Sequence, residues 1–275
     1  MINKEERTVR AFYNTIGWQI AKDGVTEDAN RWEDLREAAS CYVSKTRLRL
    51  LRHIPSEGGN FLDMASGPIQ YTEYLKYSEN FNKRYCIDFS ALALSEAKAK
   101  IGNHGVFLEG NFLDINLEEN LFDCTISIHT IYHIDKDLQE KAVRKLLYLT
   151  KPGKPVLIVY SNPFTLISLP IRLIRRFKKL LSEKTFALAP EPNSELYFYR
   201  HANEWWNKFN DISSVEIYPW RAFAANFTKV FIPNNCFGKK IFDLIFYLED
   251  TFPSFFVKYF QYQLIILTKR DAVRL

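Results

Sequence analysis

The stretch "NFLDMASGPIQYTEYL" (Asn60–Leu75) decides the fold, because an apolar run ends in an acid and is followed by small residues and one glycine. The apolar run predicts a short buried strand, and the residues after the loop predict a helix. Ala65, Ser66 and Gly67 would let backbone N–H groups approach a ligand closely, next to the positive end of that helix. Pro68 stands where a dinucleotide-binding loop has its second glycine, so it disfavours a pyrophosphate. The loop therefore predicts a ligand that has an amino-acid tail and no phosphate.

Strands and helices alternate on both sides of this stretch, from about residue 39 to residue 270. Apolar runs predict strands at 60–65, 83–89, 105–111, 123–129, 155–161, 213–223 and 262–270. Helical spacing and caps predict helices at 41–54, 71–78, 90–102, 135–150 and 201–210. Continuous apolar strands that alternate with helices indicate a parallel sheet covered on both faces. We therefore expect a Rossmann-like, doubly wound α/β domain.

Two segments do not follow this rhythm. Residues 1–38 are predicted to form an N-terminal cap, and residues 39–275 the main domain, with 163–199 as an insertion over the C-terminal edge of the sheet. Within the insertion, residues 166–181 have apolar side chains at helical spacing and basic ones opposite, which predicts an amphipathic helix. We interpret it as a lid over the ligand, and contact with an anionic membrane stays open as the alternative.

Composition limits the function classes. The net charge of +5 is mild and not concentrated, so the sequence does not favour nucleic acid as a partner. The N-terminus is charged and no apolar run reaches the length of a membrane span, which predicts a cytoplasmic protein, peripheral to the inner membrane face if 166–181 meets lipid. The four cysteines lack metal-ligand spacing, and Cys86 and Cys124 lie in apolar runs, which predicts buried thiols and no metal. The oligomeric state is not predicted.

Asp88 ends the second predicted strand and lies 25 residues after Asp63. This is close to the spacing at which an acid binds the two hydroxyls of a ribose in nucleotide-binding sheets. In an open parallel sheet, ligands bind outside the strand C-termini, usually between the first and the fourth strand. The alternative is that Asp88 is an ordinary turn or cap residue.

The fourth predicted strand leads into "SIHTIYHI", with His129 at its end and His133 four residues later. Both side chains would face the cleft if a helical turn begins there. Histidine suits the role of a base near neutral pH, so both are candidate catalytic residues for a hydroxyl acceptor. The alternative is structural, with His133 capping the next helix or bonded in the core.

The motifs "FLDMASGP", "CIDFS", "EGNFLDI", "LFDCTISIHTIYHI" and "LTKPGKPVLIVYS" resemble, in order and spacing, the class I S-adenosylmethionine-dependent methyltransferases, most closely the bacterial small-molecule group. The resemblance covers about residues 60–161 and, loosely, the last two strands. It implies a seven-stranded sheet of order 3-2-1-4-5-7-6 with an antiparallel last strand. It also implies S-adenosyl-L-methionine as cofactor.

The resemblance assigns Asp88 to the ribose hydroxyls and Phe89 to the face of the adenine. The family's acid after strand three falls on Asn111, whose amide carbonyl can also accept a hydrogen bond, and Asp114 is the competing assignment. The residues expected at the cofactor are Asp63, Ala65, Ser66, Gly67, Asp88, Phe89, Asn111, Phe112 and His129.

The function expected from these residues is methyl transfer to a small acceptor that is partly apolar, or linked to a saccharide or lipid. Oxygen is favoured as the acceptor atom, because no "NPPY"-like motif follows strand four and no reactive cysteine pair is present. The aromatic-rich second half would line the acceptor pocket. One alternative is a cofactor-binding scaffold of the same fold that has lost its chemistry. Another is an NAD-dependent oxidoreductase, which Pro68 opposes.

Overall fold

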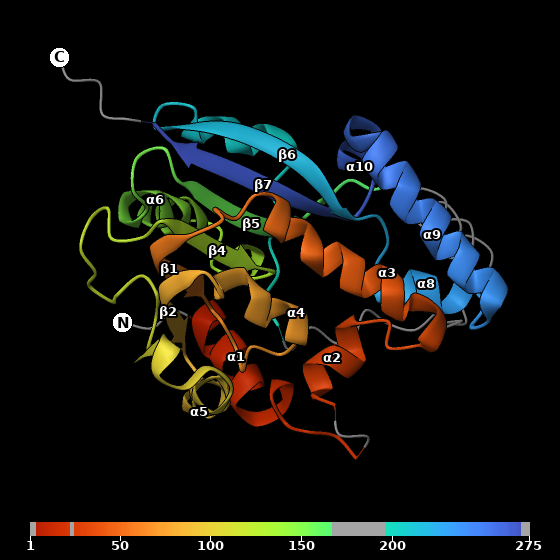
Figure 1. Ribbon diagram of the computed structural model, residues 1–275, viewed down its shortest axis with the longest axis horizontal. Coiled ribbons are helices and arrows are strands. Elements are labelled where there is room, and N and C mark those ends of the chain that lie inside the picture. The colour runs from red at the N-terminus through yellow and green to blue at the C-terminus, as the bar shows by residue number, and fades with distance from the viewer. Residues whose placement is uncertain (1–3, 23–24, 167–195, 271–275) are drawn as a thin grey trace.

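The computed structural model describes residues 4–22, 25–166 and 196–270, and a seven-stranded sheet forms the centre of this part of the chain (Figure 1). The strand order is β3-β2-β1-β4-β5-β7-β6, with β7 antiparallel to both of its neighbours. The strands are β1 Gly58–Met64, β2 Phe81–Asp88, β3 Gly105–Glu109, β4 Cys124–Ile128, β5 Pro155–Ser161, β6 Ser213–Arg221 and β7 Tyr262–Lys269. The predicted fold class and strand order are confirmed.

Helices cover both faces of the sheet (Figure 1). The α-helices are α1 Lys4–Phe12, α2 Glu27–Trp32, α3 Glu37–Leu48, α4 Thr72–Leu75, α5 Ala91–Ile101, α6 Gln139–Leu149, α8 Ala225–Phe231, α9 Cys236–Thr251 and α10 Pro253–Tyr259. Shorter 3₁₀ turns lie at η2 Arg49–Arg52, η3 Lys76–Ser78, η5 Ile131–His133 and η6 Asn203–Phe209, and a π-helical turn, η1, at Tyr13–Gly17.

Side chains alternate between the two faces along the central strands, as the pleat requires. On β1, Leu62 packs with α6 and η6 on one face, while Phe61 packs with η2 and η3 on the other. Both side chains are fully buried. Cys86 of β2 and Cys124 of β4 are buried in these layers as free thiols, as the sequence predicts. The double cover explains why the strands read as continuous apolar runs.

Local signals set several helix ends. The Ser90 hydroxyl accepts a hydrogen bond from the Ala93 N–H and so caps α5, which ends at Gly102 with φ 49°. The start of α6 differs from the prediction, because residues 135–138 form a turn in which the Asp135 carboxylate accepts from the Asp137 N–H. The predicted helix 201–210 is a 3₁₀ helix over 203–209.

Three helices that the sequence analysis did not predict, α8 to α10, lie beside α3 at the β6–β7 end of the sheet (Figure 1). α9 packs along α3, and α10 packs on β6.

At the other end of the chain, α1 packs through Val9 and Phe12 against Leu196. Apart from Leu166, the predicted amphipathic helix 166–181 lies outside the described residues. In the described part of the chain, every helix is too short or too polar to span a bilayer.

Candidate active site

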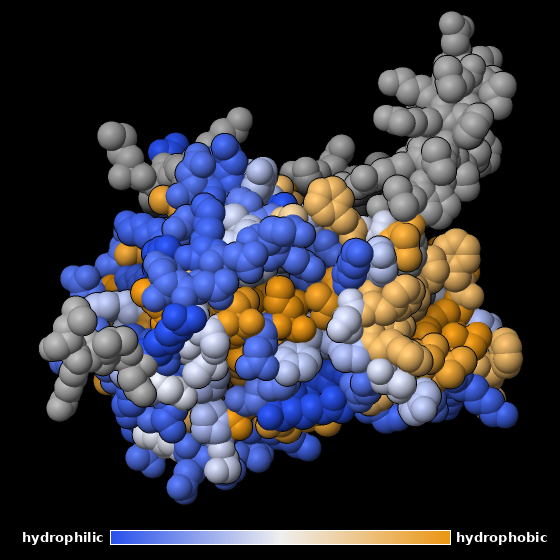
Figure 2. All heavy atoms as spheres, turned by 90° about the horizontal axis from the view of Figure 1, so that it is seen from above, coloured by the Kyte–Doolittle hydropathy of each residue, from blue (hydrophilic) through white to orange (hydrophobic). Residues whose placement is uncertain are grey.

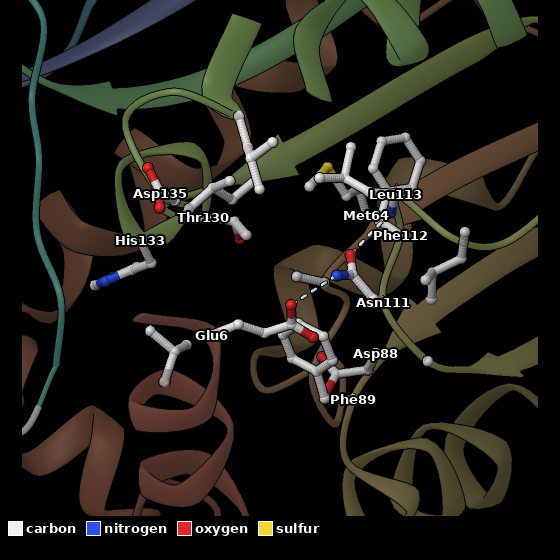
Figure 3. Close-up of a pocket in the computed structure, with 16 residues that line it drawn as sticks. Glu6, Met64, Asp88, Phe89, Asn111, Phe112, Leu113, Thr130, His133 and Asp135 are labelled. Carbon is white, nitrogen blue, oxygen red and sulfur yellow. Dashed lines mark hydrogen bonds between the residues drawn. The ribbon is translucent and has the colours of Figure 1, made fainter. Parts of the chain in front are cut away.

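A cavity that opens to solvent lies beyond the C-terminal ends of β1, β2 and β3 (Figure 3). Helix α1 and the segment after β4 close its other sides. Its lining residues are Glu6, Val9, Met64, Ala65, Ile87, Asp88, Phe89, Gly110, Asn111, Phe112, Leu113, Thr130, His133, Ile134, Asp135 and Leu138. The lining is apolar except for a few carboxyl, amide, hydroxyl and imidazole groups, which is typical of a small-molecule site.

Asp88 contributes the carboxylate at the end of β2. Its Oδ2 accepts a hydrogen bond of 2.9 Å from the Gly67 N–H, and its Oδ1 accepts one of 2.9 Å from the Ser90 N–H. Each oxygen therefore keeps a second lone pair for a ligand. Burial raises the pKa of the Asp88 carboxyl to about 6, although the backbone donors oppose this shift. The side chain is held in place by two neighbouring loops before any ligand arrives.

The loop after β1 takes its shape from three residues in the left-handed region, Ala65 with φ 57°, Gly67 with φ 53° and Ile69 with φ 50°. Ala65 lines the cavity, whereas Ser66 and Gly67 do not. A Cβ built on Gly67 would lie 2.7 Å from Cη2 of Trp18, so the indole of the N-terminal segment presses on the loop backbone. Gly67 is thus required by both its φ and this contact.

Asp63, which was predicted to lie at the cofactor, is buried in an ion pair with Arg84 and does not line the cavity. Burial raises the pKa of the Asp63 carboxyl, and Arg84 opposes this shift. The Arg84 guanidinium also donates to the Tyr74 carbonyl oxygen at 2.6 Å. The pair therefore links β1, β2 and α4 behind the loop.

Asn111 and Glu6 meet at the β3 side of the cavity (Figure 3). The Asn111 Oδ1 accepts from the Leu113 N–H at 2.9 Å, and its Nδ2 donates to Glu6 Oε2 at 3.0 Å. Burial raises the pKa of the Glu6 carboxyl, and Asp114 adds to the shift. Asp114 itself does not line the cavity. Glu6 was missed because its helix is predicted only as part of a cap, and nothing in its local sequence points to a ligand.

The two candidate histidines lie in different surroundings. His129, at φ 57°, is half-buried and does not line the cavity, and its buried Nδ1 atom has no hydrogen-bond partner among the described residues. Burial lowers its pKa to about 3. His133 lines the cavity and its ring points toward the segment 196–201, where its Nδ1 lies 2.9 Å from the Tyr197 carbonyl oxygen (Figure 3). Burial lowers the pKa of His133 to about 4, so both rings are neutral near pH 7.

An aromatic wall, which we define as Trp32, Tyr132, His133 and Phe198, adjoins the cavity on the side of His133. The Phe198 ring centroid lies 4.4 Å from that of His133 and 5.9 Å from that of Tyr132, with which it stacks. Trp32 contacts the edge of Phe198 at 6.0 Å. The wall combines α2, η5 and the segment 196–201, which are distant in sequence.

The sequence matches a family model described as "Methyltransferase domain" over residues 62–158, which runs from β1 to β5 and includes the loops that hold Asp88 and Asn111. Residues 62–158 of the chain carry a methyltransferase domain. S-adenosyl-L-methionine is the cofactor of this methyltransferase, as predicted. A search of curated protein sequences found no match.

Solved structures with the same fold belong to several methyltransferases. A phosphoethanolamine N-methyltransferase of Haemonchus contortus matches with a TM-score of 0.60 at 10% identity, over 100% of this chain and 51% of its own. A methyltransferase of Archaeoglobus fulgidus matches with a TM-score of 0.52 at 14% identity. The match covers 83% of this chain and 93% of the Archaeoglobus chain. A geranyl diphosphate methyltransferase matches with a TM-score of 0.51 at 14% identity. The match covers 82% of this chain and 78% of the other. At such low identity these likenesses concern the fold alone.

The cavity of this methyltransferase fits the cofactor. The buried Asp88 carboxylate has an acceptor position left on each oxygen, which suits two neighbouring ribose hydroxyls. Ile87, Phe89 and Phe112 offer apolar surface for a flat base next to it, and the amide–carboxyl pair of Asn111 and Glu6 offers acceptors at its edge. Of the predicted cofactor residues, the structure brings Ala65, Asp88, Phe89, Asn111 and Phe112 together around the cavity.

Proposed function

We propose that this methyltransferase methylates an oxygen atom of a small, partly apolar acceptor, and that His133 receives the acceptor's proton. The observation that carries the proposal is the state of the His133 imidazole. Its Nδ1 lies 2.9 Å from the Tyr197 carbonyl oxygen, which fixes the proton on Nδ1 and leaves the lone pair on Nε2. Burial lowers the pKa of His133 to about 4, which makes it a weaker base than a free imidazole, so the geometry and not the pKa supports the role. The Nε2 lone pair has no hydrogen-bond partner among the described residues, so it can accept a proton.

The chain's own residues account for each part of the transfer. S-adenosyl-L-methionine supplies a methyl group on a positively charged sulfur. The methyl group would replace the hydroxyl proton on the acceptor oxygen, the sulfur would leave as a neutral thioether, and His133 Nε2 would take the proton and release it to solvent. Asp88 and the Asn111–Glu6 pair hold the nucleoside, and closure by α1 excludes water. Ser66, Gly67, Asp63 and His129 would then support the site through the loops rather than by contact.

The aromatic wall supports an acceptor with apolar character. Its rings offer flat surface beside His133, and Phe198 is 39% exposed, which leaves part of this surface open to a ligand. A lipid-linked or phenolic hydroxyl would fit such a wall better than a free sugar.

The experiment measures S-adenosylhomocysteine formation with a panel of phenols, saccharides and hydroxylated lipids, and with matched amines. His133→Ala should lower the turnover number by about 100- to 10,000-fold, the usual loss of a general base. The affinity for S-adenosylhomocysteine, measured by calorimetry, should change little.

The matched control is His104→Ala, because His104 lies away from the cavity, where its Nε2 bonds Ser78 Oγ at 3.2 Å. It should keep full turnover. Equal losses of turnover and cofactor affinity in His133→Ala would assign His133 to structure. Methylation of amines alone would reject oxygen as the acceptor atom. Cofactor binding without turnover on any acceptor would favour a silent scaffold of the same fold.

A further inference from the structure

Helix α9 is apolar on two opposite faces. On its inner face, Phe242 is buried and stacks on Tyr42 of α3 at a centroid distance of 5.1 Å. On its outer face, Phe237, Leu244 and Tyr247 are each more than half exposed. These three follow one another at helical spacing and form a stripe along the whole helix. A helix that is apolar on both sides is typical of one that is covered on both sides.

The stripe continues onto the neighbouring helices. Val230 and Phe231 at the end of α8 are 73% and 64% exposed, and Phe252 and Phe255 at the start of α10 are 55% and 48% exposed. Figure 2 shows apolar side chains gathered at the end of the molecule where α8 to α10 lie. The exposed side chains between positions 230 and 258 form one surface, here called the α8–α10 face. Exposed patches of this kind mark interaction sites.

The charges around the α8–α10 face are not balanced. The three acidic residues between 225 and 260 are Asp243, Glu249 and Asp250, and each forms an ion pair of 2.7–3.1 Å with a basic residue of α3 or η2. Lys240 and Lys258 have no acidic partner among the described residues. Lys240 lies on the outer stripe itself, between Phe237 and Leu244. The face therefore combines apolar rings with uncompensated positive charge.

We propose that the α8–α10 face binds the surface of an anionic lipid bilayer. Phenylalanine and tyrosine rings enter the boundary between headgroups and acyl chains, and lysine stems let the ammonium groups reach lipid phosphates. A second copy of this chain fits less well, because a contact of the face with itself brings the lysines of both copies together while the acids of the face are already paired. The inference does not depend on the identity of the methyl acceptor.

The test is co-sedimentation of the full chain with vesicles of phosphatidylcholine alone, and with vesicles that also contain phosphatidylglycerol. The unmodified protein should bind the anionic vesicles, and binding should weaken as salt rises. The double variant Leu244→Glu, Tyr247→Glu should lose at least about tenfold in partitioning, since it removes two apolar side chains and adds two negative charges. Lys240→Glu should lower the partitioning into anionic vesicles about fivefold or more, because it replaces a positive charge by a negative one.

Matched controls come from α5, which carries an exposed apolar residue, Leu92, and an exposed basic one, Lys98. Leu92→Glu and Lys98→Glu should bind vesicles as the unmodified protein does, and all variants should keep the same melting temperature and elution volume. Unchanged binding by the α9 variants overturns the proposal, as does a lack of binding by the unmodified protein. It is also overturned if the unmodified chain is a dimer that the α9 variants dissociate. A loss of binding confined to Arg175→Glu, Arg176→Glu would overturn it by assigning the contact to the segment 166–181.

Discussion

Replacing Asp88 by asparagine should weaken cofactor binding by a predictable amount. The side chain keeps its size, but one oxygen becomes an amide NH₂ group that cannot accept from a ribose hydroxyl, and the hydrogen bond to the remaining oxygen loses its charge. Each Asp88 oxygen already accepts one backbone N–H at 2.9 Å, so each has one position left for a hydroxyl. A hydrogen bond to a charged group contributes about 1 kcal/mol more than a neutral one. The weakened bond and the lost bond together give at least about 2 kcal/mol, or at least about a 30-fold loss of affinity for S-adenosylhomocysteine.

The same carboxyl makes binding depend on pH. Because burial raises the pKa of Asp88 to about 6, the carboxylate is the minor form below that pH. If the cofactor binds only to the carboxylate, the Asp88 carboxyl must lose its proton before binding. The affinity for S-adenosylhomocysteine should then fall about tenfold per pH unit below pH 6 and be constant above it. The pKa of His133 is lowered to about 4 and does not interfere in this window. In Asp88→Asn the tenfold fall per pH unit below pH 6 should be absent, and the weaker dependence that remains should follow Glu6, whose pKa is also raised by burial.

Calorimetric titration with S-adenosylhomocysteine between about pH 5 and 8 measures both effects. Asp114→Asn is the matched control, because Asp114 follows the same edge of the sheet but does not line the cavity. Its affinity should stay within about twofold of the unmodified protein's. Unchanged affinity in Asp88→Asn, or a tenfold fall per pH unit below pH 6 that survives undiminished in it, would refute the proposed role of this carboxylate.

Three further changes test the surroundings of the site. Glu6→Ala should lower the affinity for S-adenosylhomocysteine about tenfold in calorimetry, because Glu6 links α1 to Asn111 over the cavity at 3.0 Å; an unchanged affinity would exclude a role for α1 in closure. Gly67→Ala should lower the free energy of unfolding by about 1–3 kcal/mol in urea titrations, since its φ is 53° and the new Cβ would lie 2.7 Å from Trp18; equal stability would mean that the indole moves away freely. Asp123→Asn should destabilise the protein by about 1–3 kcal/mol at pH 7. Because a lysine ammonium and two backbone N–H groups lower the pKa of Asp123, this difference should vanish as pH falls below its ordinary value of 3.8, and a constant difference would contradict the assignment.

The sheet could be predicted because each strand carries its own signal. The continuous apolar runs, the Ser90 cap and Gly102 are local features, and local features determine strand and helix ends. Asp88 could be found for a related reason, since strand C-termini of a parallel sheet meet at one edge, whereas Asn111 and Phe112 were assigned through the resemblance to methyltransferases.

Other parts of the site and the surface depend on contacts between distant segments. Glu6 reaches Asn111 only because α1 folds back across the cavity, which no spacing in the sequence records. Asp63 lies next to the loop in sequence, but its side chain pairs with Arg84 of the neighbouring strand and therefore does not reach the cavity. Helix α9 was missed although the Asn235 side chain caps its start, which is a local signal of the same kind as Ser90 at α5.

A crystal structure of the full chain with S-adenosylhomocysteine tests the central claim most directly. The account predicts both ribose hydroxyls within hydrogen-bond distance of the Asp88 carboxylate, with the sulfur facing His133 and the aromatic wall. A nucleoside bound elsewhere, or a sulfur turned away from His133, would contradict it.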